Sequence, residues 1–162
     1  MKKILYLTIS VILVVMTSEC SGYKPIFNSE NLQFKIVNHT IVGNQDLGNR
    51  IYAKLHNLSK SSKAKQSKKE VSITIETTKN KIANIKNSAG KITEYKISLV
   101  SKITINDLSS MNVILDNNFA NSITYKVQDQ YSDTVNLENQ TIEDLINKTY
   151  QDLIIKFSEK VN

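Results

Sequence analysis

The residue with the most specific chemistry in this sequence is Cys20, the only cysteine among the 162 residues. It stands shortly after a basic pair, Lys2 and Lys3, and an apolar run from Ile4 to Met16. That run has the length of a secretory signal core, about 7–15 residues, and is shorter than the ~20 residues of a membrane-spanning helix. A cysteine at this place is typical of a bacterial lipobox, in which the thiol is acylated. The sequence therefore predicts a lipid anchor at Cys20 and a location outside the cytoplasm.

The residues just before the cysteine leave alternatives open. Thr17 and Ser18 are small enough for a signal peptidase, whereas Glu19 stands where a lipobox normally has Gly, Ala or Ser. An uncleaved N-terminal anchor, or ordinary secretory cleavage with an incidental Cys20, would also fit. In every case a single cysteine excludes an intramolecular disulfide. A multiply acylated cysteine would hold the protein on a membrane without a spanning helix.

The other reactive side chains form no catalytic pattern. His39 and His56 are the only histidines, and with Cys20 acylated no thiolate remains to complete a zinc or copper site with them. The sequence has no nucleophile-elbow, zinc-protease, Walker or dinucleotide-binding motif. Glu143 and Asp144 are adjacent, so they point to different sides of a helix and suit helix capping better than acid–base catalysis. We therefore expect no enzyme activity, no metal and no cofactor.

The charge balance is positive, with 21 Lys and Arg against 15 Asp and Glu and a net charge of +6. An exported protein meets no nucleic acid, so the charge suits an anionic surface or a glycolipid, although nucleotide composition explains it equally well. Ser59–Lys69 concentrates five lysines and four serines without an acidic residue. This segment is either a solvated linker or a patch that attracts phosphate groups.

Composition divides the chain into three parts. Residues 1–19 form the predicted signal peptide, and residues 20–31 form a tether with the only proline, Pro25. Residues 32–162 form one domain. At this length a chain buries about two-thirds of its unfolded surface, which is enough for a core without disulfides.

Along the domain, the spacing of apolar residues changes between that of a strand and that of a helix. Leu32 to Ile36 alternate apolar and polar residues and predict a first strand, and a polar connection is expected over 38–44. A helix is predicted over 45–58, because its apolar residues fall on one face: Leu47, Ile51, Leu55 and Leu58. Renewed alternation predicts three antiparallel strands with one buried and one wet face. These strands cover about 71–85, 95–105 and 111–127.

Local features and a second helix complete the predicted fold. Asn87–Lys91 predicts a hairpin turn, Val100–Ser101 a bulge, and Asn117–Asn118 a kink. Tyr131–Asn139 is predicted as a polar connection, and Thr141–Asp144 as the capping box of the last helix. The predicted class is α+β: a two-layer sandwich, in the order β-α-β-β-β-α, with about four mostly antiparallel strands and two helices on one face.

Three stretches resemble the lipopolysaccharide-assembly lipoprotein family LptE in its alphaproteobacterial form. Cys20–Phe27 is similar to the family's lipidated start, with Ser21 inserted after the cysteine. Gly90–Leu99 is similar to its second hairpin, where glycine precedes an alternating strand with Thr and Tyr. The segment from Ser122, through Tyr131, to the end is similar to its last strand and closing helix. These stretches follow one another in the same order as in the family, along essentially the whole mature chain.

The resemblance implies an outer-membrane lipoprotein on the periplasmic side. Such a protein sits as plug and assembly partner in the lumen of an LptD-like β-barrel and takes part in lipopolysaccharide transport. We expect Lys91, Lys96 and Lys126, with the Lys60–Lys69 segment, to contact the phosphates of lipopolysaccharide, since lysine attracts phosphate as a point charge. The alternative is another periplasmic lipoprotein module, pilotin-like or binding a small ligand.

Overall fold

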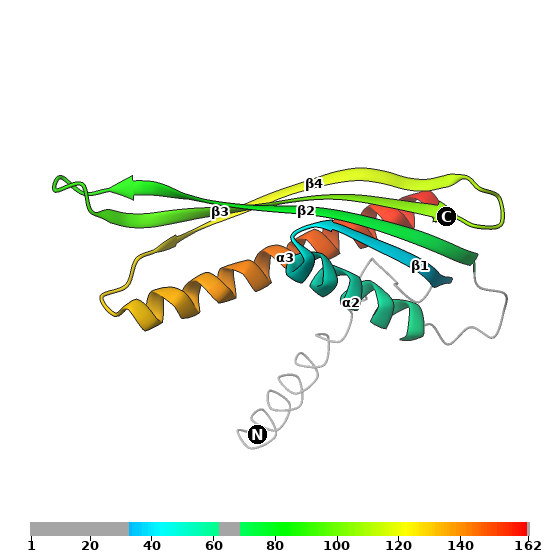
Figure 1. The fold of residues 1–162 in the computed structure, drawn as a ribbon, viewed down its shortest axis with the longest axis horizontal. Helices are drawn as coiled ribbons and strands as arrows, with labels where there is room; N and C mark the ends of the chain where they lie inside the picture. The colour runs from blue at the N-terminus through cyan, green and yellow to red at the C-terminus, as the bar shows by residue number, and fades with distance from the viewer. Residues whose placement is uncertain (1–32, 62–68, 162) are drawn as a thin grey trace, which may run out of the picture.

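The computed structural model of the chain describes residues 33–61 and 69–161. Their elements are β1 (Phe34–Gly43), α2 (Gln45–Ser61), β2 (Lys69–Lys86), β3 (Ile92–Asp107), β4 (Val113–Lys126) and α3 (Tyr131–Val161). The strands form one sheet in the order β1-β2-β3-β4, and both helices lie along the same face of it (Figure 1). The predicted two-layer α+β class, its element order and its helix placement are confirmed.

The first strand pairs parallel to β2, and α2 makes the connection between them. Strand β1 continues through residues 38–43, where the sequence predicted a polar connection over 38–44. The prediction was wrong because this is an edge strand. Its polar residues Asn38, His39 and Thr40 are exposed while their backbones pair with β2. At the corner, Asn44 caps α2, since its Oδ1 accepts a hydrogen bond from the Leu47 N–H at 3.1 Å.

Strands β2, β3 and β4 form the antiparallel meander that the alternation predicted. No bulge occurs at Val100–Ser101, because the register runs unbroken with Val100 exposed on the outside and Ser101 fully buried inside. The alternation of faces thus continues with a serine in an apolar position. Asn117 and Asn118 also lie in unbroken register opposite β3, so the predicted kink is absent. The register shifts that do occur lie near Ala83 and near Ile105.

The core lies between the inner sheet face and the two helices. The strands contribute Val71, Ile73, Ile75, Ile97, Leu99, Ile103 and Ile105, and the helices contribute Leu47, Ile51, Leu55, Leu145, Ile146, Leu153 and Phe157. Phe34 at the start of β1 meets Phe157 near the end of α3 edge to face, with ring centroids 5.1 Å apart. This contact joins the first and last described elements of the chain.

The last helix begins at Tyr131, well before the predicted capping box. Thr141 lies inside the helix, and its hydroxyl donates a hydrogen bond to the Leu137 carbonyl at 2.7 Å instead of capping an end. The polar segment 131–139 is helical because Leu137 packs on the core and Glu138 pairs with Lys81. At this end of the sheet, the β2–β3 hairpin projects beyond the beginning of α3 (Figure 1).

Candidate functional site at the lysine-rich end of the sheet

The sheet face directed away from the helices, called the outer face below, is polar. The polar residues that alternate with the core residues along the strands are all exposed or half-buried: Ser72, Thr74, Lys96, Ser98, Lys102, Thr104, Thr124 and Lys126. Ile82 and Val100 interrupt this pattern as exposed apolar side chains, with exposed fractions of 49% and 38%. The outer face is therefore suited to water or to a polar partner.

Two of the three lysines predicted to contact lipopolysaccharide share this outer face. Lys96 pairs with Thr124 and Glu94 pairs with Lys126 across β3 and β4, so the two lysines are diagonal neighbours. Glu94 lies beside both and accepts a hydrogen bond from the Asn84 amide. Two cations thus flank one carboxylate on an open surface.

The third predicted lysine, Lys91, lies at the same end of the molecule as Lys96 and Lys126. It lines a cavity of about 470 Å³ between the end of the sheet and the beginning of α3. The other lining residues include Lys81, Tyr95, Gln128, Asp129, Tyr131 and Glu138. The structure therefore places Lys91, Lys96 and Lys126 at one end of the sheet, but it does not bring all three to one surface.

A polar network that the sequence did not predict borders this cavity. Lys81 donates to the Glu138 carboxylate at 2.5 Å, and the Tyr125 hydroxyl donates to the same oxygen at 2.9 Å. The Lys81 ammonium also lies over the Tyr95 ring, 4.3 Å from its centroid. Lys81 and Glu138 are 57 positions apart in sequence, so no local sequence pattern predicts that they pair.

The network fixes the charge states of its members. Partial burial tends to raise the pKa of Glu138, but the hydrogen bonds from Lys81 and Tyr125 outweigh it and hold that pKa below its usual value. Burial tends to lower the pKa of Lys81, and Glu138 with Tyr125 raises it well above the usual value. The pKa of Tyr125 is raised, mainly by burial. At neutral pH the network is therefore an ion pair bridged by a neutral tyrosine.

Replacing Glu138 by glutamine is expected to lower the free energy of unfolding by about 1 kcal/mol at neutral pH, because the ion pair is lost in a half-buried site. Since the folded-state pKa of Glu138 is lowered, its stabilisation is present above the unfolded value, 4.5, and is lost as the pH falls through the folded value. Urea unfolding between pH 3 and 7 measures this. The difference between wild type and Glu138→Gln should shrink below about pH 4.5.

The matched control is Glu159→Gln, which removes an exposed carboxylate paired with Lys156 in the same helix. A pH-independent difference between wild type and Glu138→Gln would contradict this account of the network.

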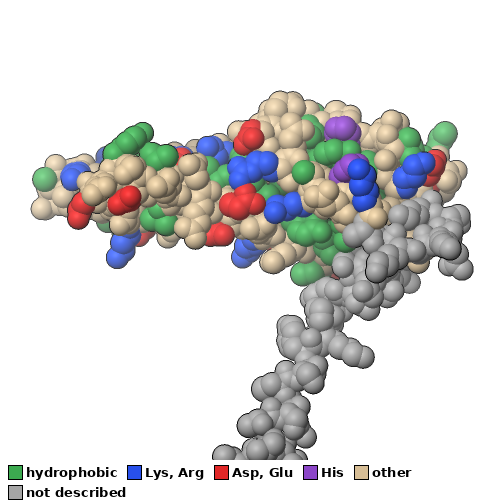
Figure 2. All heavy atoms as spheres, turned by 90° about the horizontal axis from the view of Figure 1, so that it is seen from below, with side chains coloured by type: hydrophobic (Ala, Val, Ile, Leu, Met, Phe, Trp, Pro, Cys, Tyr) green, Lys and Arg blue, Asp and Glu red, His purple; other side chains and the backbone are tan. Residues whose placement is uncertain are grey.

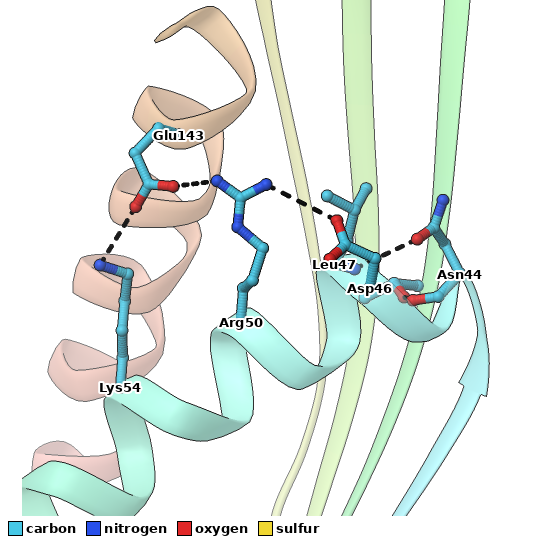
Figure 3. Close-up of polar contacts among 7 residues, drawn as sticks. Asn44, Asp46, Leu47, Arg50, Lys54 and Glu143 are labelled. Carbon is cyan, nitrogen blue, oxygen red and sulfur yellow. Dashed lines mark hydrogen bonds and ion pairs between the residues drawn. The ribbon is translucent and has the colours of Figure 1, made fainter. Parts of the chain in front are cut away.

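A second charged cluster joins the two helices (Figure 3). Glu143 of α3 accepts a hydrogen bond from Arg50 and lies 3.4 Å from the Lys54 ammonium, both on α2. Asp46 lies 3.7 Å from the other Arg50 nitrogen. Partial burial tends to raise the pKa of Glu143, but Arg50 and Lys54 outweigh it and lower that pKa. Glu143 thus links α2 to α3, where the sequence predicted a helix cap.

The histidines lie together on the side of the molecule that bears the helices (Figure 2, purple). His39 belongs to β1 and stacks on Tyr52 of α2, with ring centroids 3.9 Å apart. The Tyr52 ring also stacks with His56, with ring centroids 5.6 Å apart. His39 is exposed and lies within strand β1, in the region where the sequence predicted a polar connection. Within residues 33–61 and 69–161, no group of three His, Cys, Asp or Glu is placed to hold a metal ion.

Several predictions concern residues outside the described ranges. They are the lipidation of Cys20, the signal peptide 1–19, the tether 20–31 and the central part of the Lys60–Lys69 segment. Of that segment, Lys60 lies in the last turn of α2 and Lys69 begins β2. Among the helices in the described part of the chain, none has the length and apolar character required to cross a membrane.

Comparison with solved structures defines the class of fold. No protein-family model matches the sequence, and no curated protein matches it. The fold is that of a group of bacterial lipoproteins of known structure. A minor lipoprotein from Acinetobacter baumannii superposes with a TM-score of 0.54 at 15% identity, over 79% of this chain and 93% of that one.

Two further structures with this fold each carry the name lipoprotein B. Rare lipoprotein B from Shewanella oneidensis superposes with a TM-score of 0.54 at 11% identity, covering 77% of this chain and 97% of that one. Lipoprotein B from Nitrosomonas europaea gives 0.56 at 15% identity, over 82% of this chain and 88% of that one. At these identities the similarity establishes the fold.

Proposed function

We propose that this chain is a lipoprotein of the outer membrane, anchored through Cys20, that serves as plug and assembly partner of an LptD-like β-barrel in lipopolysaccharide transport. The observation that carries the proposal is the fold, which nearly the whole of rare lipoprotein B shares with this chain. The resemblance of Cys20–Phe27 and Gly90–Leu99 to the LptE family supports it independently of the fold.

The surface of the domain is compatible with this role. A plug in a polar barrel lumen requires a core that is complete within one chain and an exterior that tolerates polar walls. The helices bury the inner sheet face, while the outer face is polar and bears Lys96, Lys102 and Lys126. Figure 2 shows basic and acidic side chains interspersed across the helix-bearing side as well. Such surfaces bind through hydrogen bonds and charge more than through apolar burial.

The test is affinity purification of the tagged full chain from detergent-solubilised outer membranes, with the co-purifying partner identified by mass. We expect one stoichiometric, heat-modifiable barrel protein that is much larger than a small porin. A Cys20→Ala variant serves as control and is expected to leave the membrane fraction. Recovery of the wild-type chain alone, or only from inner membranes, would overturn the proposal and favour a different lipoprotein module.

Lys96 and Lys126 on the outer face are expected to contact lipopolysaccharide phosphates. Reversing the charge of both Lys96 and Lys126 to glutamate should weaken lipopolysaccharide binding by about tenfold, because exposed charge pairs contribute up to about 1 kcal/mol each. Binding of labelled lipopolysaccharide to the full chain in detergent, at two salt concentrations, measures the effect.

The matched control reverses Lys102 and Lys156, which changes the net charge equally. Lys102 lies farther along the same face, and Lys156 lies on α3. If both double variants bind lipopolysaccharide equally, Lys96 and Lys126 do not form a specific contact site.

A further inference from the structure

Strand β2 is much longer than its parallel neighbour. The pairing of β1 with β2 ends where Gly43 meets Thr77, because the chain turns there into α2. Strand β2 continues to Lys86, paired only with β3. All residues from Thr78 to Lys86 are exposed. Beyond the end of β1, β2 therefore presents one open edge among the described residues (Figure 1, left of the end of β1).

The direction of the backbone groups on this edge follows from the last pairing with the β1–α2 corner. The Thr77 carbonyl accepts a hydrogen bond from the Asn44 N–H at 2.8 Å. The backbone N–H and C=O of Thr77 therefore point toward β1. Because backbone groups alternate sides along a strand, Lys79, Lys81 and Ala83 direct their N–H and C=O groups to the same open side. The residues between them bond to β3. Unpaired edges of this kind accept an additional strand.

The charge around the edge favours one kind of partner. Residues 77–93 contain four lysines and no acidic residue: Lys79, Lys81, Lys86 and Lys91. Only Lys81 makes a salt bridge with the described residues, to Glu138. Pairing two copies of this edge would place lysines against lysines, and like charges on facing strands are unfavourable. A strand that carries carboxylates would neutralise the other three lysines of this region, since Lys81 is already paired with Glu138.

The surroundings of the edge offer contacts for side chains as well. On the helix side lies the cavity of about 470 Å³ lined by Lys81, Tyr95, Tyr131 and Glu138. On the outer face, Ile82 is half exposed beside the same stretch of backbone. Strand addition gains affinity from main-chain hydrogen bonds and specificity from pockets that receive alternate side chains. Both elements are present within Thr78–Ala83 and its neighbours.

We propose that Thr78–Ala83 is a docking edge on which an extended, acidic segment of a partner protein adds as a strand beside β2, in line with β1. This interaction is separate from the lipid contacts of Lys96 and Lys126. It does not depend on the partner being a β-barrel.

The probe is a seven-residue peptide that alternates glutamate with valine or threonine, added to the full chain in detergent. Amide hydrogen exchange, followed residue by residue by NMR, is the measurement. We expect saturating peptide to slow exchange of the Lys79, Lys81 and Ala83 amides by at least about tenfold, since each gains a hydrogen bond. The amides of Asn80 and Ile82, already bonded to β3, should change little.

Two control peptides test backbone pairing and charge separately. The same peptide N-methylated at alternate residues cannot form the ladder, and a version with lysine for glutamate should bind at least tenfold more weakly. Protection of the three amides by the acidic peptide alone supports the proposal. Absence of protection, or equal protection by all three peptides, overturns it.

A variant examines the edge from the other side. Lys79→Pro removes one edge N–H without breaking a hydrogen bond to β3, and proline is tolerated at sheet edges. It should abolish peptide protection of Lys81 and Ala83, whereas Lys79→Thr should reduce it only slightly. If Lys79→Pro fails to fold, the N-methylated peptide still decides the question. Unchanged protection in folded Lys79→Pro would overturn the proposal.

Discussion

Replacing Gly43 by alanine is expected to lower the free energy of unfolding by about 3 kcal/mol, combining left-handed backbone strain with a steric clash. Gly43 has a φ of +78° at the corner between β1 and α2. A Cβ built there would lie 2.3 Å from the Thr77 carbonyl oxygen, and this atom belongs to the backbone of a central strand. The clash is relieved only if β1 separates from β2 or α2 changes its start.

Gly90 provides a matched control for this prediction. It has the same φ of +78°, but a Cβ there meets nothing within 4 Å. Gly90→Ala should therefore show the conformational strain alone, about 1 kcal/mol. Chemical unfolding of both variants, followed by circular dichroism, separates the two contributions. Equal losses would mean that the clash with Thr77 contributes nothing.

Truncating Phe157 to alanine is expected to cost about 4 kcal/mol, the range found when a buried aromatic side chain leaves a cavity. Phe157 is 1% exposed and packs edge to face on Phe34, so the truncation disturbs both α3 and the start of β1. Thermal and chemical unfolding measure the loss.

Tyr131→Ala is the control for Phe157→Ala, because Tyr131 is an aromatic residue of the same helix that is 83% exposed. It should change the free energy of unfolding by no more than about 0.5 kcal/mol. A double variant at Phe34 and Phe157 that loses the sum of the two single losses would show that the rings do not interact.

The sequence predicted the architecture because the hydrophobic periodicity is strong where the core lies. The alternation at Ile73, Ile75, Ile103 and Ile105 identified strands, and these four inward side chains are buried. The prediction failed where polar residues occupy strand positions that are usually apolar. Ser101 occupies an inward position and resembled a bulge, and Asn38 to Thr40 belong to an edge strand that has little apolar surface to bury.

The candidate site was predictable only in part. Lys96 and Lys126 follow from the outward phase of their strands, and the structure places both on the outer face. The Lys81–Glu138 pair and the open edge of β2 depend on contacts between distant parts of the chain. The edge exists only because β1 ends at Gly43 while β2 continues, and the length of one strand relative to its neighbour is not encoded locally.

The polar outer face bears on whether the domain must bind a partner in order to fold. A sheet whose outward side chains are already satisfied by water needs no covering layer, so the domain can reach its final form before any partner is present. Folding and assembly are then separate steps. We therefore expect the domain to be stable by itself, so that binding to a partner is not required for folding.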